Sequence, residues 1–126
     1  MDNPAVVPRV LVIGLDPYRV PGPWDPGPVA EGIEVGRARF VRHGVPATFC
    51  LFGLDGSDDV DGVVAAALQA QAWDCVVVGG GVRHQPELFE RVINLVRRHA
   101  AGAAIAFNAT PEDTFDAAAR WVEMPG

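Results

Sequence analysis

Lysine is missing from this chain of 126 residues, and all ten of its basic residues are arginines. The absence excludes a P-loop, in which a lysine binds the nucleotide phosphates, and every mechanism that needs a Schiff base or a catalytic ammonium group. Arginine together with abundant alanine, glycine, valine and proline is typical of a protein from a GC-rich genome. Composition therefore explains the missing lysine without a functional reason.

Long apolar runs and an excess of positive charge are missing as well. No apolar run reaches the roughly 18 residues that a membrane-spanning helix needs, and residues 1–8 lack the basic stretch and long apolar region of a secretory signal. The net charge of -6 opposes binding to nucleic acid or to an anionic membrane. We therefore expect a single cytoplasmic domain, residues 1–126, without a nucleic-acid or membrane partner.

Cysteine and histidine are too few and too scattered for metal or thiol chemistry. Cys50 and Cys75 both lie inside apolar segments and form no C-x-x-C pair. The three histidines, His43, His84 and His99, are far apart in the sequence, so no ligand spacing typical of zinc is present. We expect neither a metal site nor a cofactor.

The stretch that organises the chain is residues 73–86, WDCVVVGGGVRHQP. Its apolar run at 74–78 predicts a strand buried on both faces, as in the interior of a parallel sheet. Three glycines, 79–81, follow the run; they admit positive φ and allow another backbone or a ligand to approach closely. Pro86 then suits the first position of a helix, because it lacks only an amide hydrogen that would have no partner there. The unit is strand, glycine turn and helix.

The rest of the chain repeats this alternation of strand and helix. Glycine and proline mark the breaks between segments, and a proline-rich loop at 15–28 follows the first strand. Residues 121–124 either form a fifth strand or continue the last helix. The sequence predicts strands at 9–14, 46–53, 74–78 and 103–107, and helices at 29–43, about 60–68, 86–99 and about 111–121.

Strands that alternate with helices favour an α/β three-layer sandwich with a parallel sheet of four to five strands. Two strand orders are compatible with this pattern, the flavodoxin-like 2-1-3-4(-5) and the dinucleotide-binding 3-2-1-4. We expect the first, because the chain is short and residues 76–78 look as central as the first strand. In that order the strands of Cys50 and Cys75 lie about 10 Å apart, too far for a disulfide.

In size and element order the whole chain resembles flavodoxin-like and response-regulator receiver domains. The segments VVVGGGVR and AFNATPEDT resemble small bacterial proteins of unassigned function, a resemblance that implies no chemistry. The activities of the larger families do not carry over. Gly79 stands where a receiver has its phosphate-accepting aspartate, and residues 15–28 replace the phosphate loop of a flavodoxin. A dinucleotide fingerprint starting at Gly79 and Gly81 has His84 in place of its third glycine.

The site is expected from position, because ligands of open α/β sheets bind beyond the carboxyl ends of the strands. Arg83 and the free amides after Gly81 suit an anion, and Asp16 or His84 could move a proton. The candidate catalytic residues are Asp16 and His84, and the candidate ligand-binding residues are Gly79, Gly80, Gly81, Arg83, Asn108 and Thr110.

Two functions are compatible with these residues. The first is a non-catalytic binding or interaction module with a degenerate flavodoxin-like fold. The second is a small enzyme or binding protein for an anionic metabolite at the carboxyl edge of the sheet. The outer strands, 46–53 and 103–107, are too apolar to stay uncovered. We therefore also expect a homodimer through the last helix, with Trp121 and Met124 in the interface.

Overall fold

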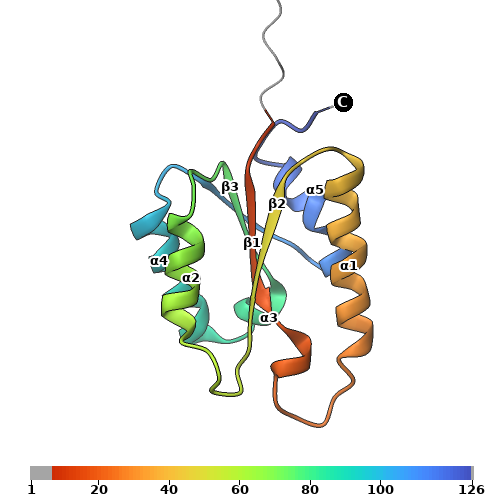
Figure 1. Cartoon of the computed structure of the whole chain (residues 1–126), viewed down its shortest axis with the longest axis vertical. Coiled ribbons are helices and arrows are strands. Elements are labelled where there is room, and N and C mark those ends of the chain that lie inside the picture. Colours follow the sequence, from red (N-terminus) through yellow and green to blue (C-terminus); the bar gives the residue numbers. More distant parts are fainter. Residues whose placement is uncertain (1–6, 126) are drawn as a thin grey trace, which may run out of the picture.

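The computed structural model describes residues 7–125. Its four strands are all parallel and form one sheet in the order β2-β1-β3-β4 (Figure 1). This order confirms the predicted flavodoxin-like topology and excludes 3-2-1-4. The strands are β1 (Val10–Leu15), β2 (Ala47–Phe52), β3 (Cys75–Val78) and β4 (Ala104–Phe107).

Helices cover both faces of the sheet and give the predicted three layers. Figure 1 shows α2 and α4 on one side of the strands and α1 and α5 on the other. Two short 3-10 turns and a one-turn helix complete the connections. The helices are α1 (Gly27–Arg42), α2 (Val60–Gln69), α3 (Gly80–Arg83), α4 (Pro86–His99) and α5 (Thr114–Ala119), and the 3-10 turns are η1 (Pro17–Arg19) and η2 (Pro111–Asp113).

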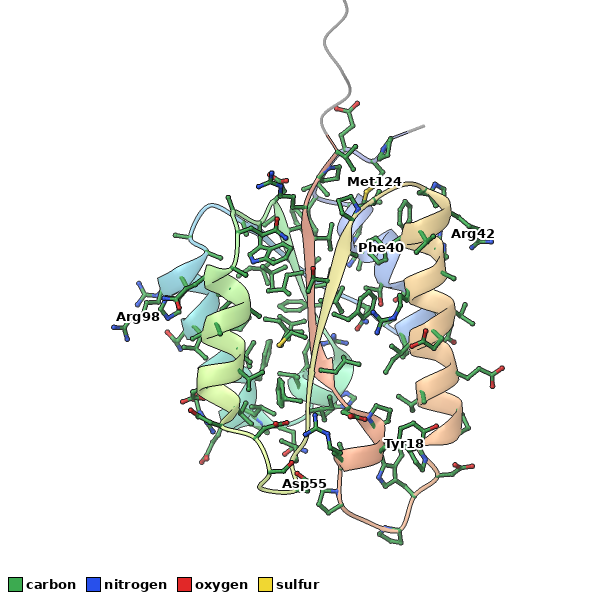
Figure 2. All side chains as sticks on the ribbon, viewed as in Figure 1. Tyr18, Phe40, Arg42, Asp55, Arg98 and Met124 are labelled. Atoms are coloured by element: carbon green, nitrogen blue, oxygen red, sulfur yellow. The ribbon has the colours of Figure 1, made fainter. Side chains whose placement is uncertain are left out.

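The apolar runs of β1 and β3 are interior strands, as predicted. All four residues of β3 are fully buried. Because successive side chains of a strand point to opposite faces, Ile13 and Val78 pack toward α2 and α4, whereas Val12 and Val77 pack toward α1 and α5. Phe40 points from α1 into the second of these cores (Figure 2).

The two cysteines lie on opposite sides of β1. Cys50 of β2 pairs in register with Ile13, and Cys75 of β3 pairs with Val10. Both thiols are free and buried, and they belong to the cores of opposite faces of the sheet. The predicted separation of the pair is confirmed.

Helix boundaries follow the local signals. Asp59 caps α2 by accepting a hydrogen bond from the amide of Gly62, and Pro86 begins α4. Gly44 ends α1 with a φ of 67°, a left-handed conformation that glycine adopts without strain. None of the helices within residues 7–125 is long and apolar enough to cross a membrane.

The glycine turn differs from the expectation. Residues 80–83 form helix α3 with negative φ, and positive φ within the described residues is confined to glycines 22, 44 and 56. Gly81 is needed for close approach instead, because a Cβ there would lie 2.9 Å from Cδ1 of Leu15. The chain changes direction at the end of β3 because α3 begins after a single intervening residue.

A fifth strand is not formed by residues 121–124. The amides of Trp121 and Val122 still donate to the carbonyl of Ala118 as the last turn of α5 ends, which leaves them unavailable to a sheet. Val122 and Met124 pack against the α1/α5 core as irregular chain. The apolar character of this segment serves packing, whereas Trp121 is 61% exposed.

Candidate functional site

A cavity of about 510 Å³ lies at the carboxyl ends of the strands, on the side of the sheet that faces α1. It lies where β1 is flanked by β2 and β3, the point at which the strand order reverses and open α/β sheets bind ligands. Its wall is made of residues from β1, η1, the proline-rich loop, α1, β2, α3 and the segment after β4. These residues are Val12, Ile13, Gly14, Leu15, Pro17, Val20, Pro21, Trp24, Val29, Ile33, Phe49, Leu51, Gly79, Gly80, Gly81, His84, Gln85, Asn108, Ala109, Thr110, Pro111 and Thr114.

The floor of the cavity is formed by the α1 side of β1 and β2. Val12 of β1 and Phe49 of β2 face α1, and the next residues on this side are Gly14 and Leu51. A Cβ at Gly14 would meet only Cδ2 of Leu51, at 3.4 Å, so the missing side chain leaves space above the strand. The cavity therefore depends on a glycine inside a strand.

The docking of α1 against η2 closes the cavity on one side. Gly32 and Gly36 are buried on α1, one helical turn apart. A Cβ at Gly36 would collide with the carbonyl oxygen of Pro111, and a Cβ at Gly32 would collide with the carboxylate of Glu112. These two glycines let the helix approach the η2 backbone closely, which holds the wall of α1 over the sheet.

The polar side chains at the β4 end of the cavity are bonded to one another. Asn108 is buried, and its Nδ2 donates to Oγ1 of Thr114 at 3.0 Å. The hydroxyl of Thr114 in turn donates to the carbonyl of Pro111 at 2.7 Å. Thr110 begins η2 with a capping box that it shares with Asp113. Asn108 and Thr110 thus line the cavity, and both shape the turn after β4.

Arg83 joins the ends of β3 and β4 and does not line the cavity. Its Nη1 donates to the carbonyl of Val78 at 2.7 Å and to Oδ1 of Asn108 at 3.2 Å, and its Nη2 donates to the carbonyl of Asn108 at 2.5 Å. The guanidinium also packs 5.5 Å from the ring centre of Phe107. Burial lowers the pKa of Arg83 from its usual value, yet an arginine stays charged at neutral pH.

Asp16 belongs to a cluster that fastens η1 to the loop after β2. It caps η1 by accepting from the amide of Tyr18 at 3.0 Å, and its Oδ2 pairs with Nε of Arg19 at 3.0 Å. Nη1 of Arg19 also pairs with Oδ2 of Asp58 at 2.7 Å. The hydrogen bond to Asp16 raises the pKa of Arg19. Figure 2 shows Tyr18 and Asp55 at this same end of the molecule.

His84 is the one histidine among the described residues of the cavity wall. It ends α3 and lies beside the glycines of residues 79–81. The wall contains no carboxylate, arginine, tyrosine or cysteine. A general base must lie within hydrogen-bond reach of the proton that it removes, and His84 is the one side chain of the described wall that is suited to this role.

The structure thus divides the predicted site residues into two groups. Glycines 79–81, His84, Asn108 and Thr110 lie together on the cavity wall, whereas Asp16 and Arg83 are bonded elsewhere. The apolar part of the wall, which includes Ile33 and Phe49, is not among the predicted site residues. Its one signal in the sequence is Gly14, a glycine at the end of a buried strand.

Trp24 connects the proline-rich loop to this wall. Its Nε1 donates to the carbonyl of Val20 at 3.0 Å, so the loop is folded back on itself with the indole at the cavity. The side chain remains 40% exposed. A half-exposed aromatic ring at the mouth of an apolar cavity is suited to cover a bound molecule.

Acidic, histidine and cysteine side chains nowhere form a group of three or more that could hold a metal ion, as far as residues 7–125 are concerned. No protein-family model matches this chain, and no curated protein is significantly similar to it.

Proposed function

We propose that this chain is a non-catalytic binding module that holds a small, largely apolar molecule in the cavity between α1 and the carboxyl end of the sheet. The observation that carries the proposal is the wall itself, which encloses about 510 Å³ with apolar side chains and glycine backbone and has His84 as its one titratable side chain. Small-molecule sites have typical volumes of roughly 300–1,000 Å³, with apolar walls and a few polar groups that fix orientation.

Binding is favoured over catalysis by the positions of the charged residues. Asp16 is paired with Arg19, and Arg83 is bonded to the backbone of Val78 and Asn108. Either residue would have to give up these contacts before it could act on a molecule in the cavity. A lone histidine can bind a polar group, whereas nucleophilic catalysis needs a nucleophile and a base in reach of the same substrate.

The ligand that fits this wall best has a flat or compact apolar body and one polar end. The body would lie between Phe49 and Ile33, and the polar end would lie toward His84 and Gln85. A carboxylate at that end is the second candidate, because a protonated imidazole would attract it. In this version of the anionic-metabolite hypothesis, His84 rather than Arg83 binds the carboxylate of the ligand.

Calorimetric titration with indole and with indole-3-acetate tests both the apolar ligand and the ligand with a carboxylate. The two probes share the apolar body and differ in the carboxylate. We expect saturable binding of at least one probe to the full chain. If the carboxylate is recognised by His84, indole-3-acetate should bind more tightly than indole, and His84→Gln should remove that preference.

Gly14→Val is the variant that blocks the cavity, because its side chain would extend from the floor into the space above β1. We expect at least about tenfold weaker binding with a folded protein. Gly102→Val is the matched control, since a Cβ at that glycine meets nothing within 4 Å. Equal binding by the wild type and Gly14→Val, or no binding of either probe, would refute the proposal.

We also propose that the protein works in a bacterial cytoplasm. The all-arginine, alanine-rich composition supports a GC-rich bacterial genome. Two free thiols buried in the cores of opposite sheet faces are compatible with a reducing compartment. Mass spectrometry of the protein isolated from its native cells should find both cysteines reduced, and an oxidised or disulfide-linked form would contradict this location.

A further inference from the structure

The outer edge of β4 has backbone groups that no strand of the described chain pairs. The amide of Ala104 donates to the carbonyl of Asp74 at 2.9 Å, so Ala104 and Ala106 direct their backbone groups toward β3. Because successive residues alternate, Ile105 and Phe107 direct theirs outward. The carbonyl of Phe107 accepts a hydrogen bond from Nη2 of Arg120 at 2.8 Å. An edge of this kind accepts a further strand.

An apolar groove of about 430 Å³ runs beside this edge, between β4 and α4. Ile105 and Phe107 form the strand side of the groove, and Phe89 and Ile93 form its helix side. Phe107 packs edge to face against Phe89, with ring centres 5.6 Å apart, but stays 41% exposed. Edge and groove together form one surface with partly exposed apolar side chains and, apart from the carbonyl of Phe107, outward backbone groups that no strand of the described chain pairs.

The charges on α4 beside the groove are self-complementary. Glu90 and Arg97 are seven residues apart, two helical turns, so both lie on the same side of α4. Both are exposed, and neither makes an ion pair with another residue of 7–125. Glu90 lines the groove. A second α4 running antiparallel would place its Arg97 opposite this Glu90, and its Glu90 opposite this Arg97.

The midpoints of α4 and β4 lie at the same level, as a single two-fold axis through both contacts requires. The point halfway between Glu90 and Arg97 lies at Ile93 and Asn94, and both of these residues line the groove with Ile105. Helix and strand are therefore centred at the same level. A two-fold rotation about that level pairs β4 with β4 antiparallel and brings the two α4 helices side by side.

We propose that a second copy of this chain occupies the β4 edge, and that the two sheets join through antiparallel β4 strands in a symmetric homodimer. Two Glu90–Arg97 ion pairs would flank the joined grooves. The last helix is a poorer surface, because Met124 packs against the core of its own chain. The dimer does not depend on the ligand cavity, which lies on the α1 side of the sheet.

Sedimentation equilibrium of the full chain and of charge-reversed variants tests the proposal. The wild type should be dimeric at micromolar concentration. Glu90→Arg and Arg97→Glu each turn two attractive pairs into two repulsive ones, so each should weaken the dimer by roughly tenfold or more. An equimolar mixture of the two variants should form a heterodimer, because arginine then faces glutamate at both positions. The double variant should again form a homodimer.

Arg98→Glu is the matched control. Arg98 lies two helical turns after Arg91, which pairs with Asp61 of α2, so Arg98 faces α2 rather than the groove. Its reversal should leave the dissociation constant within about twofold of the wild type. A monomeric wild type would overturn the proposal. So would a dimer that both single variants leave intact, and so would a dimer that is abolished by Trp121→Ser but unaffected by the charge reversals.

Discussion

The two faces of the sheet are packed differently, although the same strands supply both. On the α2/α4 face, Ile13, Phe52 and Val78 are fully buried along the length of the strands. On the α1/α5 face, Phe40 and Phe115 pack edge to face with ring centres 5.4 Å apart. There the cavity occupies the carboxyl end of the strands. At the carboxyl ends of the central strands the α2/α4 face is filled, whereas the α1/α5 face is open there. The groove on the α2/α4 side lies at the outer edge of the sheet, between β4 and α4.

The difference has its origin in the size of a few side chains. Neighbouring residues of β1 point to opposite faces, so Ile13 fills the α2/α4 side while Gly14 leaves the α1 side empty. On α1, Gly36 then sets how close the helix comes to η2. The α2/α4 face therefore contributes more to stability, and the α1/α5 face contains the space for a ligand. A substitution on one face should affect one of these properties more than the other.

The largest expected effect comes from the same substitution on both faces of β2. Phe52→Ala removes a fully buried ring from the α2/α4 core and should lower the free energy of unfolding by about 3–5 kcal/mol. Phe49→Ala removes a half-buried ring that already borders the cavity, so its loss should be roughly 1–2 kcal/mol. Urea unfolding measures both values. Equal losses would mean that the α1/α5 face contributes as much to stability as its partner.

A smaller effect is expected where α1 meets η2. Gly36→Ala would push a methyl group into the carbonyl oxygen of Pro111, which is backbone and cannot turn away, so we expect a loss of about 1–3 kcal/mol. At Gly32 the obstacle is the far end of the Glu112 side chain, which can rotate outward. Gly32→Ala also gains roughly 1 kcal/mol of helix propensity, so its net effect should be near zero.

Chemical denaturation measures the stability of Gly32→Ala and Gly36→Ala, first in the wild-type chain and then in a chain that also carries Glu112→Ala. The second pair separates the steric clash with Glu112 from the gain in helix propensity. In that background Gly32→Ala should stabilise the protein, whereas Gly36→Ala should remain destabilising. Similar costs for the two glycines would show that α1 can shift away from η2, and the cavity wall would then be adjustable rather than fixed.

The topology could be predicted because it depends on local patterns. The apolar run of β3 marks a strand buried on both faces, and the alternation of strands with helices is compatible with two strand orders. Chain length and the central character of residues 76–78 were enough to choose between them. Local patterns left residues 121–124 open between a fifth strand and a continued helix. Their apolar character fits both, and the structure decides against the strand because the amides of Trp121 and Val122 bond to the carbonyl of Ala118.

The position of the candidate site could be predicted from the sequence, but the contacts of its charged residues and its apolar wall could not. Its edge follows from topology, and residues 79–81, His84, Asn108 and Thr110 do lie on the cavity wall. The partners of the charged candidates come from distant segments: Arg83 bonds Asn108 across 25 residues, and Arg19 bonds Asp58 across 39. No local spacing signals such pairs. The cavity itself is produced by a missing side chain and by the docking of α1. Neither can be predicted from the periodicity of apolar residues.

The smallest expected effect concerns the thiols of the two faces. Burial raises the pKa of Cys50, and it raises the pKa of Cys75 to about 11. Below about pH 8 each thiol is mostly protonated in both the folded and the unfolded chain, so pH has little effect on stability through them. Above that pH the unfolded chain loses its protons first, and stability must fall as the pH rises toward 11.

The loss through Cys75 should be about 1 kcal/mol between pH 9 and pH 10, because one pKa unit corresponds to about 1.4 kcal/mol. Cys75→Ala removes the group that titrates on the α1/α5 face, so its free energy of unfolding should vary less over this interval than that of the wild type. Cys50→Ala makes the same change on the α2/α4 face and should leave most of the slope in place. Both native thiols should also resist alkylation by iodoacetamide at pH 8 until urea unfolds the chain. Rapid labelling of Cys75 alone in the folded protein would mean that the α1/α5 face opens without global unfolding, at the amino end of β3 where Cys75 lies.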